Sequence, residues 1–510
     1  MTATITYKGE TLATAHNNTK VLETEGMYLE DDITITDVTS GTGTLITKLI
    51  SANGTYNASD DSADGYSSVT VNVSGGGTTP VTQKQINFID YDGTLLYSYT
   101  KAEIEAMIAE SDLPSNPTHT GLTSQGWNWT LAQIKAQLTA IPDEDVWVGQ
   151  NYVTSDGKTR IDITLSNRRS PYFSCAVNGT ITIDWGDGST STLTGTSLTT
   201  RKSTSHSYAS SGDYTITITV NSGSFAFFGT TAYTVLNNNS STTNKNNVYS
   251  SDINNIRLGS NVSIGDYGFT KCYNLKTITI PAGLTSIGKH ALSDCHNLLC
   301  AIIPKGITTI EEYTFQITSN IVIVSIPSTV TSIGPYAFRY DVNMKRITLP
   351  FGLTSFGEYA VGGCNTLLKS ITIPCSLANY AVQNTRSIQK ITVLSGATSI
   401  GDYAFTGNHA LKDLELPNTI TSIGTHAFDE CYAIESITIP SGVTSIGSYA
   451  FSGCYGAKEY HIKPTTVPTL GSSAFSNIPS DCVIYVPSAQ LSTYKSASNW
   501  STYKNYMQGE

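Results

Sequence analysis

The chain has 510 residues and a formal net charge of −11, and only 14% of its residues are charged. This length exceeds what one hydrophobic core supports, so three or four domains are expected. The acidic charge gathers in residues 1–80, which carry ten acids and three bases, whereas residues 251–510 carry sixteen of each. Because no basic surface is available for phosphate backbones, nucleic acid is excluded as an expected partner.

The start of the chain and its apolar runs bear on location. Residues 1–18 alternate like a strand and lack the basic start and apolar core of a secretory signal. No stretch approaches 18 consecutive apolar residues, so no membrane span is predicted. These features favour a protein carried on a particle, or a shortened chain, over an anchored surface protein.

Residues 1–74 are predicted to form small β modules that serve assembly or anchoring. Two related phrases, in residues 26–35 and 54–71, each place a turn before an alternating strand. These phrases resemble amino-terminal modules of tail-associated proteins in phages of gut Firmicutes, which implies attachment to an assembly. The Gly-rich residues 75–83 are predicted to be a flexible linker.

Residues 84–150 are predicted to form a second module, with a strand followed by helical spacing in residues 101–109 and 130–138. Between the two helices the sequence reads Gly-Leu-Thr-Ser-Gln-Gly-Trp-Asn-Trp, from Gly121 to Trp129. This segment resembles the G-[YL]-x-F-x-G-W segment of internalin-type β-grasp repeats, although the usual phenylalanine is missing. We expect the tryptophans to pack in a core and not to form a ligand platform.

Residues 151–235 contain the phrases Ile-Thr-Ile-Asp-Trp-Gly-Asp-Gly, ending at Gly188, and His-Ser-Tyr, ending at Tyr208. An alternating strand follows from Tyr214. Together these phrases resemble a PKD-type domain, which implies a β-sandwich that spaces other modules from an anchor. The polar residues 236–250 are predicted to link this domain to the remainder of the chain.

Residues 251–487 repeat one phrase, best read as Ser-Ile-Gly-Ser-Tyr-Ala-Phe, mostly at a period of 23 residues. The copies begin at Ser263, Ser286, Thr309, Ser332, Ser355, Ser376, Ser399, Ser422, Ser445 and Thr469. Between copies runs a strand phrase such as Leu275-x-x-Ile278-x-Ile280-Pro281. A fixed period in this range predicts a solenoid in which each unit contacts its neighbours.

The combined pattern L-x-x-I-x-I-P followed by S-I-G-x-Y-A-F resembles the BspA-like leucine-rich repeats of bacterial surface proteins and phages. The resemblance implies a parallel ladder on one face, irregular or helical turns on the other, and a role in adhesion. The expected fold class is therefore mainly β and modular, with small β modules and a PKD-like β-sandwich before the solenoid. Residues 488–510 are expected to cap its last coil.

Nine cysteines are present, and none forms a Cys-x-x-Cys pair. Five occupy the same place in the repeat: Cys272, Cys295, Cys364, Cys431 and Cys454. Stacking would place them in one interior column, where thiols act as small apolar fillers. A disulfide between Cys272 and Cys295 is the alternative, and metal binding is disfavoured.

The search for catalytic chemistry predicts no enzyme. His290 and His426 occupy a repeat position filled elsewhere by tyrosine, and His206 belongs to the PKD-like phrase, so all three are interpreted as structural. No metalloprotease, nucleophile-elbow, Walker or dinucleotide-binding motif occurs. The turn from Asp60 to Asp64 imitates an EF-hand loop but lacks the closing glutamate, so no calcium, cofactor or metal site is predicted.

Surface binding is the better hypothesis, and the outward strand positions are where we look for it. Apolar residues cluster there in two successive repeats, and lysines recur along one column. The candidate receptor-binding residues are Leu299, Ile302, Val322, Ile323, Lys345, Lys369 and Lys412. An exposed apolar patch often marks a recognition surface. The alternatives are that another domain covers the patch, that it fills a local irregularity, or that loop tyrosines and asparagines bind a glycan.

The favoured hypothesis is a non-enzymatic receptor-binding protein of a phage tail, located in the virion. Residues 1–80 would contact a tail or baseplate protein, and the repeats would bind a host surface protein or glycan. The first alternative is a BspA-like adhesin on a bacterial surface or secreted from it. A second alternative, an envelope-degrading or glycan-degrading appendage, would need an acid pair in a cleft. Assembly into a homo-oligomer is left open.

Overall fold

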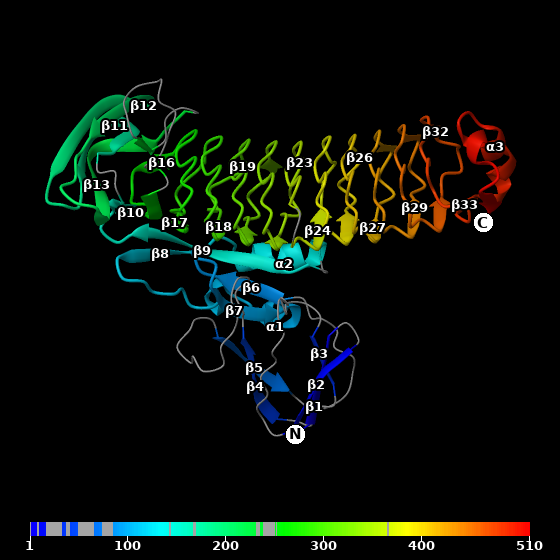
Figure 1. Cartoon of the computed structure of the whole chain (residues 1–510), viewed down its shortest axis with the longest axis horizontal. Helices are drawn as coiled ribbons and strands as arrows, with labels where there is room; N and C mark the ends of the chain where they lie inside the picture. Colours follow the sequence, from blue (N-terminus) through cyan, green and yellow to red (C-terminus); the bar gives the residue numbers. More distant parts are fainter. Residues whose placement is uncertain are drawn as a thin grey trace. The chain divides into compact units, whose positions relative to one another are not determined.

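The structure is a computed structural model that divides into two units, Met1–Gln83 and Lys84–Glu510 (Figure 1). In the second unit it describes residues 85–141, 144–166, 170–230, 235–237, 250, 252–364 and 367–510. In the first unit it describes five strands. The turn at Asp60–Asp64, the linker 75–83 and most of the linker 236–250 lie outside the described residues.

The described part of the first unit consists of two small antiparallel sheets. Its strands are β1 (Thr2–Tyr7), β2 (Glu10–His16), β3 (Ile33–Thr36), β4 (Gly41–Lys48) and β5 (Tyr66–Val73). Strand β1 lies between β2 and β3, and β4 pairs with β5. The unit is therefore all-β in its described residues.

Residues 85–154 form a four-stranded sheet with two helices, here called the docking module. Its elements are β6 (Gln85–Ile89), β7 (Leu95–Thr100), α1 (Lys101–Ala106), η1 (Glu110–Asp112), β8 (Leu122–Trp127), α2 (Leu131–Ala140) and β9 (Val146–Thr154). The sheet order is β7-β6-β9-β8, and capping boxes at Thr100 and Thr130 start the two helices. Trp127 packs edge-on against Phe88 in the module's core, as expected of a packing residue.

Residues 159–279 form one sheet that runs into the solenoid without a break. Its strands are β10 (Thr159–Leu165), β11 (Tyr172–Asp184), β12 (Thr190–Ser205), β13 (Gly212–Phe227), β14 (Leu236–Asn237), β15 (Ile253–Arg257), β16 (Val262–Ile264) and β17 (Thr277–Thr279). The order along the main path is β12-β11-β13-β10-β15-β17. Strand β15 pairs antiparallel with β10 and parallel with β17.

This continuity corrects the expectation of a PKD-like β-sandwich held apart as a spacer. Strands β10 to β13 belong to a single sheet, and its buried side chains share one hydrophobic core with the repeats. The physical reason is that the first coil of a solenoid and the edge strand β10 both carry unpaired backbone groups, which pairing satisfies. The segment therefore acts as the amino-terminal cap of the solenoid.

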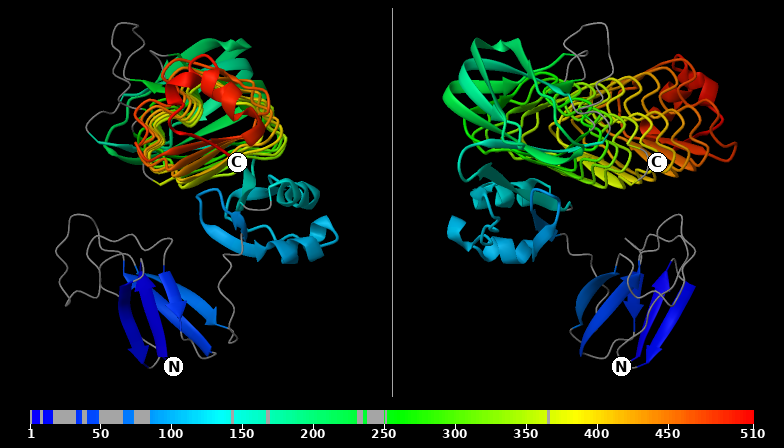
Figure 2. Two further views of the ribbon diagram at one scale, coloured as in Figure 1. Left: turned by 90° about the vertical axis from the view of Figure 1, so that its right-hand side faces the viewer. Right: turned by 60° about the vertical axis from the view of Figure 1, so that its left-hand side comes forward.

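The solenoid is a stack of coils, most of which have two short strands on different sides (Figures 1 and 2). Strands of the L-x-x-I-x-I phrase are β18 (Cys300–Ile302), β20 (Ile323–Ser325), β22 (Arg346–Ile347), β24 (Ser370–Ile373), β25 (Lys390–Val393), β27 (Asp413–Glu415), β29 (Ser436–Ile439), β31 (Glu459–Ile462) and β33 (Val483–Val486). Strands of the S-I-G phrase are β19 (Thr309–Ile310), β21 (Ser332–Ile333), β23 (Ser355–Phe356), β26 (Ser399–Ile400), β28 (Ser422–Ile423), β30 (Ser445–Ile446) and β32 (Thr469–Leu470).

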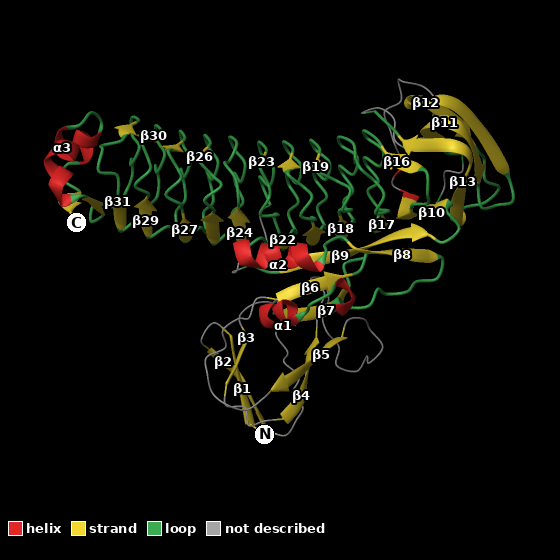
Figure 3. Ribbon diagram, turned by 180° about the vertical axis from the view of Figure 1, so that it is seen from behind, coloured by secondary structure: helices red, strands yellow, loops and turns green. Residues whose placement is uncertain are grey.

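Neighbouring coils pair in parallel and in the register that the repeat spacing predicts, such as Cys300 with Ile323 and Ser422 with Ser445. The two kinds of strand therefore form two ladders, and the mainly β solenoid inferred from the sequence is confirmed. The described turns between the ladders contain no helix (Figure 3). The turn face is thus irregular, one of the two forms expected.

Residues after β33 close the far end of the stack. The elements are η3 (Ser488–Gln490), α3 (Leu491–Ser496), η4 (Trp500–Tyr503) and β34 (Met507–Gly509). Strand β34 pairs with β33, and the buried Trp500 donates its indole N–H to the Pro468 carbonyl at 2.8 Å. This segment covers the apolar surface that the last coil would otherwise expose.

Candidate functional site

The docking module lies against the first half of the L-x-x-I-x-I ladder (Figure 1). Three of its buried amide side chains donate to backbone carbonyls of three different coils. Asn151 bonds Ile280 at 3.1 Å, Asn128 bonds Ile303 at 3.0 Å, and Gln137 bonds Leu349 at 3.0 Å. These carbonyls belong to successive parts of the ladder, so the module spans several coils and removes their outer surface from solvent.

This contact corrects the prediction of an exposed apolar patch. Ile302 is 5% exposed, and it packs with Ile89 of the module and with Ile323. A Cβ atom placed on Gly149 would lie 2.4 Å from Ile302 Cδ1, so the module approaches as closely as glycine permits. Of the other apolar candidates, Leu299 remains 44% exposed and Val322 is half-buried.

The lysine candidates do lie in one column along the ladder. Backbone bonds join Lys345 to Val322 at 2.9 Å, Gln389 to Lys369 at 2.7 Å and Lys412 to Gln389 at 2.9 Å. Lys369 and Lys412 are exposed, whereas Lys345 is half-buried. The structure therefore leaves Lys369, just before β24, and Lys412 accessible and separates them from Ile302, which the module covers.

The accessible part of the ladder, from β25 to β33, carries charges of both signs. Ion pairs join successive coils, with Lys390 and Glu415 2.9 Å apart and Lys458 and Glu435 2.5 Å apart. Glu510 at the chain end accepts from Lys463 at 2.8 Å. Exposed pairs of this kind contribute little stability each, so we interpret this face as a hydrated, patterned surface.

The turn face carries a feature that the sequence only partly indicated, a stack of rings here called the aromatic ladder. It consists of Tyr267, His290, Tyr313, Tyr336, Tyr359, Tyr380, Tyr403, His426 and Tyr449. Neighbouring ring centroids lie 4.3 to 5.1 Å apart, and no pair is tilted by more than 18°. The two histidines are ordinary rungs, which agrees with their structural interpretation.

Each rung sits in left-handed backbone conformation, with φ between 52° and 61°. Such values are uncommon for residues other than glycine and cost about 1–2 kcal/mol per residue. Stacked aromatic pairs contribute about 0.5–1.5 kcal/mol each beyond the area they bury, which offsets this strain. Burial in the stack also lowers the pKa of His290, which favours the neutral imidazole at neutral pH.

Arg339 adds a second feature of the turn face that the sequence did not indicate. Its guanidinium carbon lies 4.2 Å from the ring centre of Tyr359 and 4.5 Å from that of Tyr340. The next coil has Gly363 at the position of Tyr340, and a Cβ there would lie 2.5 Å from the Tyr340 ring. In the sequence, the paired glycines 362 and 363 could have suggested that this position leaves room for a bulky side chain of the preceding coil.

The interior column of the repeat is built from thiols and small polar groups. All nine cysteines are buried and free, so the alternative Cys272–Cys295 disulfide is not formed. Cys364 and Cys454 each donate to a phenylalanine carbonyl of the preceding coil, at 3.2 and 3.4 Å. In the same column the fully buried Asp341 accepts the Thr318 backbone N–H at 2.6 Å.

Histidine and aspartate side chains pair at several places, and two of these pairs lie in turns before the repeats. His206 Nε2 lies 2.7 Å from Asp187 Oδ2, while Ser189 donates to the other oxygen of the same carboxylate at 2.5 Å. The serine therefore bonds the carboxylate directly, and its hydroxyl also lies 3.3 Å from His206 Nε2. His119 and Asp90 pair in the same way at 2.7 Å in the docking module.

Two further kinds of feature are absent from the described residues. They contain no group of three or more His, Cys, Asp or Glu side chains placed to hold a metal ion. None of their helices has both the length and the apolar character that crossing a membrane requires.

Solved structures similar to this chain include leucine-rich proteins of bacteria. A leucine-rich repeat protein of Bacteroides ovatus is 20% identical over 49% of this chain and 77% of its own, with a TM-score of 0.34. A leucine rich cell surface protein of Faecalibacterium prausnitzii is 21% identical over 49% and 75%, with a TM-score of 0.27. The pneumococcal vaccine antigen PcpA is 17% identical over 51% and 76%, with a TM-score of 0.31.

Among curated proteins, no relative matches this chain significantly. The family described as "BspA type Leucine rich repeat region" matches it over residues 207–322, 262–379 and 375–499, with six copies. These stretches overlap and together span more than half of the 510 residues. They include the ladders, the turn face and the interior column described above. The chain therefore belongs to the BspA type leucine-rich repeat family.

Proposed function

We propose that this chain is a non-enzymatic adhesin of the bacterial cell surface, which binds its receptor through the solenoid. The observation that carries the proposal is the family match over more than half of the chain, because BspA type repeat proteins are typically bacterial surface proteins. The match supports the bacterial setting over the phage tail that residues 1–80 suggested. No observation on the described residues adds support for the virion.

The surface that remains accessible supports binding. The docking module covers the ladder near β18 and β20, which leaves the outer face from β25 to β33 and the turn face available. Both are built from short strands or stacked rings repeated in register, so their side chains are held at fixed spacing. A rigid, extended surface limits the entropy lost on binding. Lys369 and Lys412 stay candidates for receptor contact.

The arrangement of ionisable groups supports binding over catalysis. Charged side chains on the accessible ladder pair with neighbours one coil away, as Lys390 does with Glu415. The His206–Asp187 and His119–Asp90 pairs stabilise turns before the repeats. Glycoside cleavage would instead need two carboxylates facing each other across a bound sugar, and surface pairing of opposite charges does not supply that geometry.

Surface labelling tests the proposal directly. Antibodies raised against the full chain should label intact, unpermeabilised cells of the encoding bacterium, and brief trypsin treatment of those cells should remove the signal. Cells permeabilised before labelling serve as the control for total protein. Signal confined to purified phage particles, with none on intact cells, would overturn the cell-surface setting in favour of the tail.

A further inference from the structure

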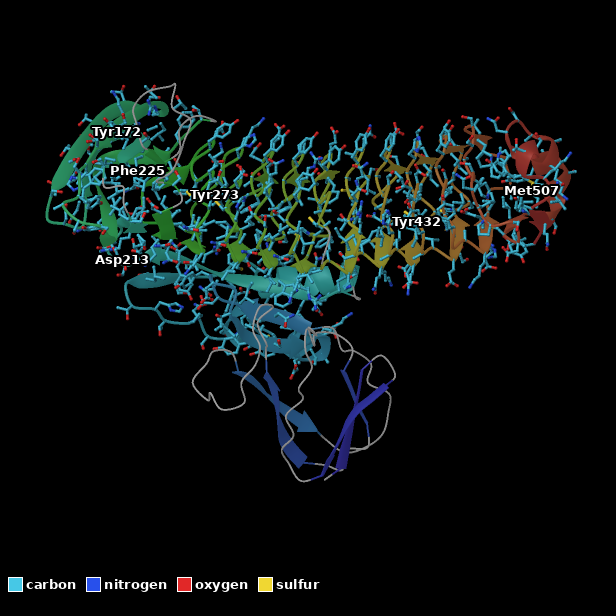
Figure 4. All side chains as sticks on the ribbon, viewed as in Figure 1. Tyr172, Asp213, Phe225, Tyr273, Tyr432 and Met507 are labelled. Carbon is cyan, nitrogen blue, oxygen red and sulfur yellow. The ribbon has the colours of Figure 1, made fainter. Side chains whose placement is uncertain are left out.

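A second column of stacked rings lies on the solenoid beside the aromatic ladder. His409, Tyr432 and Tyr455 are spaced by 4.4 and 5.4 Å, with tilts of 18° and 29° (Figure 4 labels Tyr432). Each is six residues after a rung of the aromatic ladder, so the two columns advance together from coil to coil. Both columns reach their last ring in the same coil, at Tyr449 and Tyr455.

The following coil breaks both columns. Ser473 stands where the next ladder ring would be and keeps the left-handed conformation, with φ of 58°. Pro479 stands where the next ring of the second column would be. Within the described coils, no ring stacks on the far face of Tyr449 or Tyr455, and these side chains are 39% and 60% exposed. Inner rungs such as Tyr403 instead have a ring on each side, so this coil is where both columns end.

The coil that follows Tyr449 and Tyr455 is rich in small polar groups. The coil after them places Ser472, Ser473, Ser476 and Asn477 at the turn. The hydroxyl of Ser476 is buried and has no hydrogen-bond partner, and Asn477 is exposed in left-handed conformation. Residues 445–457 and 471–480 contain no charged side chain. The end of the two columns, here called the step, thus combines aromatic rings with hydroxyl and amide groups in two segments that carry no charged side chain.

We infer that this step, formed by Tyr449 and Tyr455 with Ser473 and Asn477, is a binding site for a neutral carbohydrate. One face of a sugar ring carries mainly C–H groups and packs on an aromatic face, while its hydroxyls require donors and acceptors at the edge. The two bare faces would take two sugar units of one chain. The inference names a ligand class for the proposed adhesin and rests on that function.

The Arg339 cluster does not compete for this role. Its guanidinium is already stacked on Tyr359 and Tyr340 and donates to the Tyr340 hydroxyl at 2.9 Å. Tyr359 is an inner rung stacked between Tyr336 and Tyr380, and the Tyr340 ring already contacts the guanidinium. The bare faces at Tyr449 and Tyr455 are available without any rearrangement of the solenoid.

Titration calorimetry of the full chain with cellohexaose, maltohexaose, mannohexaose and chitohexaose tests the inference. At least one should bind with a Kd between about 1 μM and about 1 mM. Tyr449→Ala and Tyr455→Ala should each weaken binding about tenfold, because each removes one ring face. Tyr449→Phe keeps that face and should stay within about twofold of the wild type.

A second kind of variant covers the exposed face of the Tyr449 ring and removes no ring from the fold. Ser473→Tyr places a further ring on Tyr449, at a position that already has the ladder's backbone conformation. This variant should keep or raise the Tm and lose affinity about tenfold. Tyr313→Phe, an inner rung, is the matched control and should bind as the wild type does.

Two results would overturn the inference: none of the four saccharides binds the wild type, or binding survives Tyr449→Ala, Tyr455→Ala and Ser473→Tyr unchanged. Either result could accompany labelling of intact cells. In that case the adhesin proposal would stand with a different ligand class, so the failure of the two proposals can be told apart.

Discussion

The most unusual residues of this solenoid are tyrosines in left-handed backbone conformation. The φ angle of each ladder residue lies outside the ordinary range. The same angle recurs from rung to rung, and this aligns the rings face to face. The repeat position was evident from the sequence, but its φ was not. A second left-handed position four residues later is occupied by Gly363, Gly407 and Gly453 in some coils and by Tyr340 in another. Those glycines were the available signal.

The strained backbone at Tyr403 predicts that the glycine variant is more stable than the alanine variant, the reverse of the usual order. Tyr403→Ala loses stacking on both sides and keeps the strain, whereas Tyr403→Gly loses the stacking and relieves the strain. We expect both variants to be less stable than the wild type, with the glycine variant more stable than the alanine variant by about 1 kcal/mol. Urea unfolding followed by circular dichroism measures the difference.

Lys289 provides the control for Tyr403, because it neighbours a ladder position but has ordinary backbone geometry. There Lys289→Ala should be more stable than Lys289→Gly by about 0.5–1 kcal/mol, the usual order. The same order at Tyr403 would contradict the strain argument.

Asp341 is a buried acid in the column that cysteines fill in other coils. Burial raises the pKa of its carboxyl well above the ordinary value, and the Thr318 N–H bond only partly opposes this. Asn408 occupies the same column and accepts the Thr385 N–H at 2.8 Å in the same way. The fold therefore accepts a neutral amide where this coil has an acid.

Asp341→Asn should remove a pH dependence of stability. A carboxyl whose folded-state pKa exceeds the unfolded value near 3.9 stabilises the fold at low pH and loses that contribution as the pH rises. We expect the variant to match the wild type near about pH 4 and to exceed its stability near about pH 8 by at least about 1.4 kcal/mol. Urea unfolding at several pH values checks this. A difference independent of pH would show that the acid is not protonated in the fold.

At the scale of elements, the sequence predicted the strands of the repeats well but not how the docking module meets them. Periodicity fixes neighbours 23 residues apart, so ladder pairs such as Ser422 with Ser445 follow directly. The bond from Asn128 to Ile303 joins residues far apart in the chain and leaves no periodic trace. The apolar residues Ile302 and Ile323 indicated that this part of the outer strand face differs from the rest, which is mostly polar. They could not show whether a receptor or another module covers them.

Gly149→Val tests the docking of the module on the ladder. The added side chain would overlap Ile302, so β9 must move away from β18 and β20. Overpacking of this size costs about 1–3 kcal/mol. We expect Cys300, 2% exposed beneath the module, to become alkylated by iodoacetamide several times faster while the other eight cysteines stay protected. Mass spectrometry of the labelled peptides measures each site.

The control for Gly149 is Gly283→Ala, because a Cβ at Gly283 would meet no atom within 4 Å. Its labelling pattern should equal that of the wild type. A folded Gly149→Val variant with Cys300 still protected would mean that the module accommodates the side chain without leaving the ladder.

At the scale of the molecule, one hydrophobic core runs from Ile161 to Met507, beside the separate core of the docking module. The sequence predicted separate domains because linker-like composition and distinct motifs interrupt the chain. It could not reveal that β10 would pair with β15, since antiparallel pairing between a long curved sheet and a first coil follows no repeat. Both ends of the stack are thereby covered, which a one-dimensional fold requires for solubility.

Deleting residues 488–510 tests whether the far end needs its cover. The deletion removes β34 from the edge of β33 and takes Trp500 away from the Phe475 ring, whose centre lies 5.8 Å from it. An open parallel edge with apolar residues beside it recruits another copy of the same edge. We therefore expect the truncated chain to sediment as larger species in a concentration-dependent way.

Trp500→Phe is the control, because it keeps an apolar cover and loses only the bond to the Pro468 carbonyl. This variant should sediment as the wild type does and lose about 1 kcal/mol of stability. If the truncated chain sedimented like the wild type at every concentration, the terminal segment would not be needed to block end-to-end association.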